Sequence, residues 1–432
     1  MKAYKSLTFC FLAFIFPLWP ASAITNPPPI PNGFILGISQ CNEDIIPVLK
    51  QLNIHWMRIK ITWKELTPEV VEPSLRLTDV QGKPEQVRRL SQHVNWSPVD
   101  KRLLSILQRG IRPIVIVGHG YFTSHAKLNG KPACPDLIGR EKYLAQMYWT
   151  TRAIVERYDG DGIDDAPGIV IKVWQMENEL NEAALTAVWG CRQPVWLDGL
   201  SSAWADWTFL TRLLQTIYHA VKDADPEALT LMNFHTDVPA WISWLAGGHG
   251  WLDAVREWRD YMDIIGMDAY PNYFNPEPLK GEVVGARVAM IKKTATGLPV
   301  FVIETDYPSG PSVLGFTPEN QAKYIRASFQ SARNAGADAY FKFHVTDPSG
   351  LHKVTITDTD VERIKWIRQC VKNRRWLLLS GWALIHANYI KSHFLDILKV
   401  VEKYCGVFTP DGQGTAAFNE LKRIAATESN EP

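Results

Sequence analysis

Residues 298–306 read Leu-Pro-Val-Phe-Val-Ile-Glu-Thr-Asp, a short apolar run that ends abruptly in polar residues. Consecutive apolar residues without alternation are typical of a parallel strand that is covered on both faces. A carboxylate seldom ends such a strand, because removing a charge from water is costly. The stretch therefore predicts a buried parallel strand with a functional glutamate, Glu304, at its carboxyl end.

Similar apolar runs recur along the chain, and helix-like segments separate them. Two of these segments start with a capping residue and a proline, Ser97-Pro98 and Thr317-Pro318, which favour a helix start. Strand and helix in alternation predict an α/β fold, and eight strands predict closure into a (β/α)8 TIM barrel. The other seven predicted strands are residues 34–38, 56–61, 113–117, 169–174, 229–233, 264–267 and 339–343.

The loops of this barrel are expected to be elaborated, since the longest gaps follow the second, third and fourth strands. Residues 347–403 do not fit the repeat. They contain a helix-like run at 361–372 and an apolar run at 376–390 that is too short and too polar to span a bilayer. We expect a helical insertion after the eighth strand within one catalytic domain, residues 24–432. A small appended domain is the alternative.

Residues 1–23 are typical of an export signal. Lys2 and Lys5 precede an apolar run at 7–19, and residues 21–23, Ala-Ser-Ala, form a small-residue cleavage site. A membrane anchor is the alternative, but Pro17, Pro20 and the short span argue against it. The pattern predicts a secreted or periplasmic protein.

The chain carries 46 basic and 45 acidic side chains. This balance gives no electrostatic footprint for nucleic acid or an anionic membrane, and it favours a neutral substrate. We expect no metal, because no Cys-x-x-Cys or His-x-x-x-His spacing occurs, and no cofactor, because the chemistry assigned below needs none. Export permits disulfides. Cys134 with Cys191 is the favoured pair, and Cys370 with Cys405 is a weaker one. The oligomeric state cannot be predicted from the sequence.

A second glutamate ends another predicted strand, within residues 173–181, Val-Trp-Gln-Met-Glu-Asn-Glu-Leu-Asn. The carboxyl ends of barrel strands meet at one rim, where polar residues are usually catalytic. Two carboxyl groups can cleave a glycosidic bond, and a separation of about 5–5.5 Å gives retention of configuration. The two groups must titrate differently, because the acid needs a raised pKa and the nucleophile must stay charged.

These two motifs resemble the fourth and seventh strands of the clan A glycoside hydrolases. The first fits the pattern Trp-x-x-x-Asn-Glu-x-Asn at Trp174, Asn178, Glu179 and Asn181. The resemblance implies that Glu179 is the general acid/base and that Asn178 hydrogen-bonds the sugar 2-hydroxyl. It implies that Glu304 is the nucleophile.

Further positions are assigned to the substrate site. By resemblance, Arg58 holds the nucleophile as a carboxylate, Tyr270 donates to it, and His119 ends the third strand. His235, at the end of the fifth strand, and Trp63, beside the loop after the second, could line the cleft. Each residue has a structural alternative: an ion-pair arginine, a satisfied loop histidine or a core tryptophan.

The chain departs from the clan pattern at two strands. Asp306 follows Glu304-Thr305 where a glycine is common, and the eighth strand offers Phe343 or His344 in place of a tryptophan. We interpret the sequence as a retaining glycoside hydrolase of β-linked oligo- or polysaccharides. The alternatives are a catalytically inactive carbohydrate-binding barrel and a transglycosylase that uses the same residues.

Overall fold

The computed structural model describes residues 30, 33–118, 126–183, 201–245, 248–347, 356–389, 402–409 and 412–428. The predicted export signal, His119 and Cys191 lie outside these residues. The signal, the role of His119 and the pairing of Cys134 with Cys191 therefore stay predictions. Cys370 is a buried free thiol, so the weaker pairing with Cys405 is wrong.

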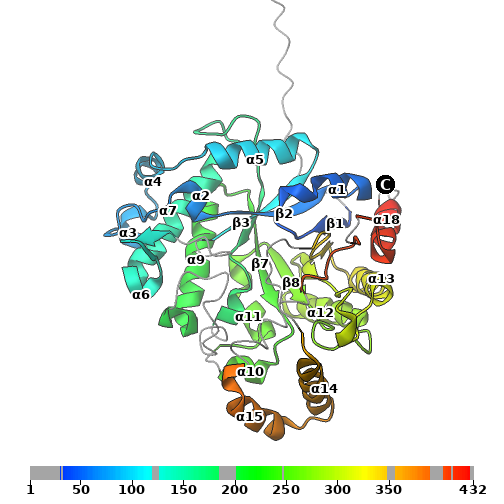
Figure 1. Cartoon of the computed structure of the whole chain (residues 1–432). Coiled ribbons are helices and arrows are strands. Elements are labelled where there is room, and N and C mark those ends of the chain that lie inside the picture. The colour runs from blue at the N-terminus through cyan, green and yellow to red at the C-terminus, as the bar shows by residue number, and fades with distance from the viewer. Residues whose placement is uncertain are drawn as a thin grey trace, which may run out of the picture.

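A closed barrel of parallel strands forms the centre of the protein (Figure 1). The first strand pairs with both the second and the last, which closes the ring and confirms the predicted fold. The barrel strands are β1 (Ile35–Ile38), β2 (Trp56–Ile61), β3 (Arg112–Val117), β6 (Val173–Met176), β7 (Leu229–His235), β8 (Ile264–Ala269), β9 (Val300–Thr305) and β10 (Ala339–Lys342).

β6 begins later than the sequence predicts. Ile169 and Ile171 are both buried, which explains their strand-like apolar character. Their backbone N–H groups donate to Ala166 and Tyr158 rather than to a neighbouring strand. Burial of the side chain and pairing of the backbone are thus separate properties, and only the first is visible in an apolar run.

An apolar layer fills the barrel interior, with at least one residue from every strand of the ring. Gly37 allows this close packing, since a Cβ there would lie 2.2 Å from the ring of Phe341. Such filling makes the barrel a packed core rather than a pore. The layer consists of Ile35, Trp56, Ile114, Val173, Leu231, Ile264, Phe301, Ile303, Ala339 and Phe341.

Helices surround the barrel and bury their apolar faces against the strands. Thr317 caps α13 as predicted, accepting from the Asn320 N–H at 3.2 Å. Ser97 does not cap α5; it is the first helical residue, and Trp96 precedes it without a side-chain cap. The longer helices are α5 (Ser97–Gln108), α7 (Arg140–Tyr158), α9 (Trp207–Ala224), α12 (Gly281–Thr294), α13 (Pro318–Asn334) and α18 (Ala416–Glu428).

Helices follow β10 where the sequence predicts an insertion: α14 (Asp358–Lys372), α15 (Trp376–Ile385) and α16 (Ala387–Tyr389). In Figure 1, α14 and α15 project from the barrel beside α10 (Ala240–Leu245). The chain then returns, and α18 lies against α13, where Arg326 pairs with Glu420. Among the described helices, none has both the length and the apolar character that crossing a bilayer requires.

Candidate active site

The carboxyl ends of the barrel strands carry buried polar side chains, in contrast to the apolar layer that fills the barrel. These residues are Arg58 on β2, Gln175 on β6, Asn233 on β7, Asp268 on β8 and Glu304 on β9. Buried polar groups at this rim are costly unless they are paired with one another, and their presence marks the rim as the functional end.

Glu179 and Glu304 meet at this rim although 125 positions separate them in the sequence. One carboxylate oxygen from each of Glu179, Asp268 and Glu304 lies within 4.8 Å of the others. Glu179 is 8% exposed and Glu304 is 5% exposed. The two predicted glutamates therefore share one site, and a third carboxyl that the sequence analysis did not select lies with them.

The backbone after β6 directs Glu179 into this site. Glu177 and Glu179 have φ values of 56° and 45°, in the left-handed region that costs free energy for residues other than glycine. The Glu177 side chain instead lies over Gly118, where an added Cβ would come within 2.7 Å of it. The two neighbouring glutamates thus face different surroundings, and only Glu179 is near Glu304.

Glu304 accepts hydrogen bonds from two predicted residues. A guanidinium N–H of Arg58 and the Tyr270 hydroxyl, at 2.6 Å, donate to different carboxylate oxygens. Burial raises the pKa of Glu304, and the nearby Glu179 charge adds to this, while Arg58 and Tyr270 oppose it by stabilising the carboxylate. Arg58 is fully buried, so its positive charge acts on Glu304 with little screening by water.

Glu179 pairs with His235, whose Nδ1 lies 2.7 Å from Glu179 Oε1. Burial alone would raise the pKa of Glu179, but the charge and hydrogen bond of His235 hold it below its usual range. Burial disfavours the charged imidazole, yet Glu179, Asp237 and Glu182 together raise the pKa of His235 to about 10. The free site thus keeps its acidic proton on the pair of Glu179 and His235, rather than on a glutamate with a raised pKa as the sequence suggested.

Asp268 is the main residue that the sequence analysis missed. It accepts a hydrogen bond from the Asn233 side-chain amide. Burial and the nearby charges of Glu304 and Glu179 raise its pKa well above the usual value, which favours the neutral form of the carboxyl group. Its position in the Asp268-Ala269-Tyr270-Pro271 stretch was a usable signal, because it ends a buried strand just as Glu304 does.

An amide network fixes the other polar residues. Asn178 Oδ1 accepts from Arg58 at 2.6 Å and from Asn233 Nδ2 at 2.8 Å. Gln175 Nε2 donates to Asn233 Oδ1 at 2.8 Å. Asn181 exchanges hydrogen bonds with the backbone of His235, at 3.0 and 3.1 Å. Because these bonds cross three strands, they hold Arg58 and His235 in place against the two glutamates.

Trp63 does not fit its predicted place in the cleft. It begins α2 (Trp63–Leu66), is 3% exposed, and packs edge-on against Trp149 of α7 with ring centroids 5.0 Å apart. It belongs to the packing between helices and barrel. Phe343, which follows β10, is only partly buried; its ring meets the Tyr270 ring edge-on at 5.5 Å and stacks on the His344 ring with centroids 3.8 Å apart.

Asp306, which replaces the common glycine, has a structural partner. It forms an ion pair with Lys342 of β10 at 2.6 Å, and both side chains are fully buried. Lys342 also donates to the Cys405 carbonyl at 2.7 Å, which attaches the returning chain to the barrel. Asp306 and Lys342 therefore link the ends of β9 and β10 to the segment before α18.

Replacing Asp306 with alanine is expected to lower the free energy of unfolding by about 3–5 kcal/mol, because it leaves the Lys342 charge buried without its partner. Urea unfolding followed by circular dichroism measures this change. Glu362→Ala, which removes an exposed ion pair with Lys365, is the matched control and should change little. A comparable loss in both variants would contradict the assigned role.

Two carboxylate clusters within the described residues could in principle attract a cation. The first consists of Glu179, Asp268 and Glu304. Two of its carboxylates already form ion pairs, Glu304 with Arg58 and Glu179 with His235. The second, Asp159, Asp161 and Asp165, lies after α7, at the opposite rim of the barrel.

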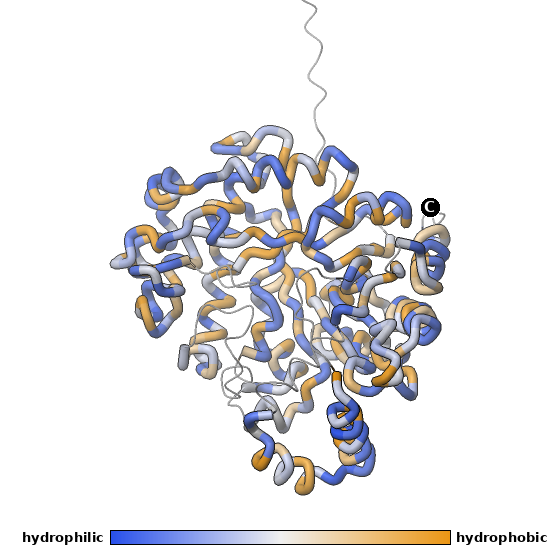
Figure 2. The backbone as a smooth tube through the Cα atoms, viewed as in Figure 1, coloured by the Kyte–Doolittle hydropathy of each residue, from blue (hydrophilic) through white to orange (hydrophobic). Residues whose placement is uncertain are grey.

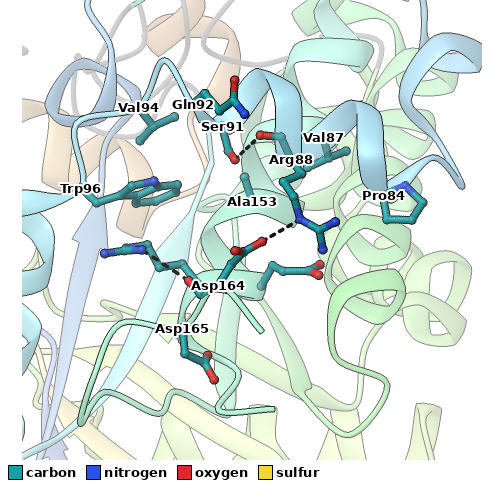
Figure 3. A pocket seen from close by; sticks show the side chains of 12 residues that line it. Pro84, Val87, Arg88, Ser91, Gln92, Val94, Trp96, Ala153, Asp164 and Asp165 are labelled. Atoms are coloured by element: carbon teal, nitrogen blue, oxygen red, sulfur yellow. Dashed lines mark hydrogen bonds and ion pairs between the residues drawn. The ribbon is translucent and has the colours of Figure 1, made fainter. Parts of the chain in front are cut away.

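The pocket in Figure 3 also lies at that opposite rim. It has a volume of about 540 Å³ and is lined by α4 (Pro84–Ser91), by Trp96 and by the loop that carries Asp164 and Asp165. That loop connects α7 to the start of β6, so it lies at the amino ends of the strands. Arg88 and Asp164 close part of it with an ion pair at 2.7 Å. The pocket is therefore separate from the two glutamates.

Comparisons with solved structures support the fold. The chain is similar to an exo-β-1,4-mannosidase from Opitutaceae bacterium strain TAV5, with a TM-score of 0.52 and 14% identity over 92% of this chain and 60% of that one. It is similar to a GH5_18 protein from Bifidobacterium longum subsp. infantis, with a TM-score of 0.55 and 12% identity over 92% of this chain and 80% of that one. It is also similar to a glucosidase from Croceicoccus marinus, with a TM-score of 0.52 and 13% identity over 92% of this chain and 69% of that one.

These similarities establish a (β/α)8 barrel of the kind that glycoside hydrolases use. No protein-family model matches the chain, and no curated protein matches its sequence. At such low identity the activity does not transfer with the fold. The functional conclusion therefore depends on the residues at the rim.

Proposed function

We propose that this protein is a retaining glycoside hydrolase, with Glu304 as the nucleophile and Glu179 as the general acid/base. One observation carries the proposal: a carboxylate oxygen of Glu179 lies within 4.8 Å of a carboxylate oxygen of Glu304. Arg58 and Tyr270 donate hydrogen bonds to Glu304, and His235 is hydrogen-bonded to Glu179. This separation suits direct attack, since an inverting enzyme needs about 6.5–9.5 Å between its carboxyl groups to admit a water.

In the first step, a Glu304 oxygen attacks the anomeric carbon while the bond to the departing oxygen breaks. The electron pair left on that oxygen takes a proton from the pair of Glu179 and His235. Arg58 and Tyr270 orient the attacking carboxylate, because each donates to one of its oxygens. The result is a glycosyl ester on Glu304 and a released alcohol.

In the second step, water attacks the same carbon and transfers a proton to Glu179. The bond to Glu304 breaks, and the carboxylate returns to Arg58 and Tyr270. The raised pKa of Asp268 favours its neutral form, which avoids a third negative charge next to Glu179. Arg58 and His235 each form an ion pair with one of the two glutamates, Arg58 with Glu304 and His235 with Glu179.

Two features support a sugar as the substrate. Both hydrogen bonds of Asn178 described above use its Oδ1, so its amide N–H group is the part that would donate to a 2-hydroxyl. Phe343 is a partly buried aromatic ring next to Tyr270, which donates to Glu304, and the apolar faces of sugar rings stack on aromatic rings. The solved neighbours include a mannosidase and a glucosidase, which supports testing β-linked glycosides first.

We also propose that the protein acts outside the cytoplasm. The basic, apolar and small-residue segments of residues 1–23 support this proposal. Expression with this segment, followed by mass measurement of the protein recovered outside the cytoplasm, should show a chain that begins after Ala23.

The stereochemistry of the product tests the mechanism. Proton NMR of early hydrolysis should show the β-anomer released from a β-glycoside before mutarotation. First release of the α-anomer would overturn the assignment of Glu304 as nucleophile. Chromatography of the same reaction separates hydrolysis from transfer to a second sugar.

The pair of Glu179 and His235 predicts the alkaline limb of activity. The folded protein raises the pKa of His235 from an ordinary value of 6.5 to about 10, so the pair keeps its acidic proton until the pH rises through about 10. We expect kcat/KM to fall only above that pH. In His235→Gln, the proton must reside on Glu179 alone, and the limb should move to lower pH. An unchanged limb in the variant would contradict this source of the proton.

A further inference from the structure

An exposed apolar surface lies on α15 and α10, outside the candidate active site. α15 reads Trp-Leu-Leu-Leu-Ser-Gly-Trp-Ala-Leu-Ile, and none of its residues is buried. Leu377, Leu384 and Ile385 are 91%, 81% and 81% exposed, and on α10 Trp241 and Trp244 are 50% and 75% exposed. So many large apolar side chains in water mark an interaction surface.

The two helices form one continuous surface. The rings of Trp241 and Trp376 meet edge-on with centroids 6.2 Å apart. Figure 1 shows α15 beside α10 at the edge of the molecule, and Figure 2 shows strongly apolar segments on this projecting part. We call it the α10–α15 surface, and its main residues are Trp241, Trp244, Trp376, Leu377, Leu384 and Ile385.

Positive charge accompanies this surface. Lys372, Arg374 and Arg375 are exposed immediately before α15, and residues 372–386 contain no acidic side chain. The chain as a whole is nearly neutral, with 46 basic and 45 acidic residues, so the whole-chain balance hides this local excess.

We propose that the α10–α15 surface binds the surface of an anionic phospholipid membrane. Tryptophan and leucine enter the boundary between headgroups and acyl chains, while adjacent lysine and arginine residues attract anionic headgroups. The helix lies on the bilayer rather than crossing it. A second copy of this chain fits less well, because a symmetric contact through this surface would bring the three cations of each copy close together.

The location of this surface relates it to the candidate active site. α10 follows β7, and α14 and α15 follow β10, so both parts of the surface emerge from the carboxyl ends of barrel strands. Glu179 and Glu304 lie at the same rim. A membrane bound by the α10–α15 surface therefore lies toward the rim of the barrel that carries Glu179 and Glu304. The binding itself does not depend on the proposed function.

Co-sedimentation of the full chain with sucrose-loaded vesicles tests the proposal without any turnover. We expect binding to vesicles of mixed phosphatidylcholine and phosphatidylglycerol, and weaker binding to phosphatidylcholine alone. Leu384→Asp with Ile385→Asp should weaken binding to both vesicles by about tenfold or more, because two apolar anchors are lost. Arg374→Gln with Arg375→Gln should weaken binding to the anionic vesicles by about tenfold and leave the neutral vesicles nearly unchanged.

Ile163→Asp is the matched control, since Ile163 is 51% exposed but belongs to the loop at the opposite rim. It should bind as the wild type does. Failure of the wild type to bind either vesicle, or equal binding by the Leu384→Asp/Ile385→Asp variant, would overturn the proposal. Analytical ultracentrifugation that shows a dimer, dissociated by that variant, together with no vesicle binding, would assign the surface to a second copy instead.

Discussion

Replacing Glu304 with glutamine is expected to lower kcat by about 10⁴-fold or more, because the first step then has no nucleophile. The amide keeps the shape of the side chain and one oxygen for a hydrogen bond, so the barrel should remain folded. Initial rates on aryl β-glycosides measure the effect, and circular dichroism checks the fold.

Glu177→Gln is the matched control for this variant. Glu177 is a buried carboxyl two positions before Glu179, but its side chain lies over Gly118, away from Glu304. We expect its loss to change stability more than turnover. Activity of Glu304→Gln close to that of the wild type, in a preparation free of wild-type protein, would end the assignment.

Replacing Glu179 with glutamine is expected to lower the rate by about 10²- to 10⁴-fold on substrates with poor leaving groups, because the departing oxygen then receives no proton. A 2,4-dinitrophenyl glycoside needs little protonation, so its first step should be nearly unaffected. Its second step should be slow, because no base activates water. Pre-steady-state measurement should therefore show a burst of phenol followed by slow turnover.

Azide provides the control for the role of Glu179. A small anion needs no general base, so azide should restore the second step in Glu179→Gln and yield a β-glycosyl azide. Azide should give no such product in Glu304→Gln, where no glycosyl ester forms. A uniform loss on every leaving group, without rescue, would show that Glu179 positions the substrate rather than transferring a proton.

Local sequence predicts the strands and the two glutamates because the relevant signal is local. Glu304 ends an apolar run of four residues, and Glu179 comes three positions after the largely apolar stretch Val173–Met176. Burial of the strand and the exceptional carboxylate are visible within nine residues in each case. The alternation of such runs with helical segments then predicts the closed barrel.

Other features depend on contacts across strands and were missed or wrong. The position of Asp268 near the end of a buried strand is a local signal, but its raised pKa depends on Glu179 and Glu304, which come from other parts of the barrel. Trp63 follows a strand, as a cleft residue would, but α2 turns its ring toward Trp149. Position after a strand gives the rim on which a residue lies, not the direction in which its side chain points.

The sequence by itself determined the (β/α)8 barrel, the pair of glutamates and their approach to one rim, because strand period, burial and chain direction are properties of consecutive residues. The tertiary structure alone decided where the proton resides. The ionisation of Glu179, Asp268 and Glu304 depends on Arg58, His235 and on one another, and these charges come from five different strands and loops. Electrostatic energy depends on distance in space, and distance along the chain does not predict it.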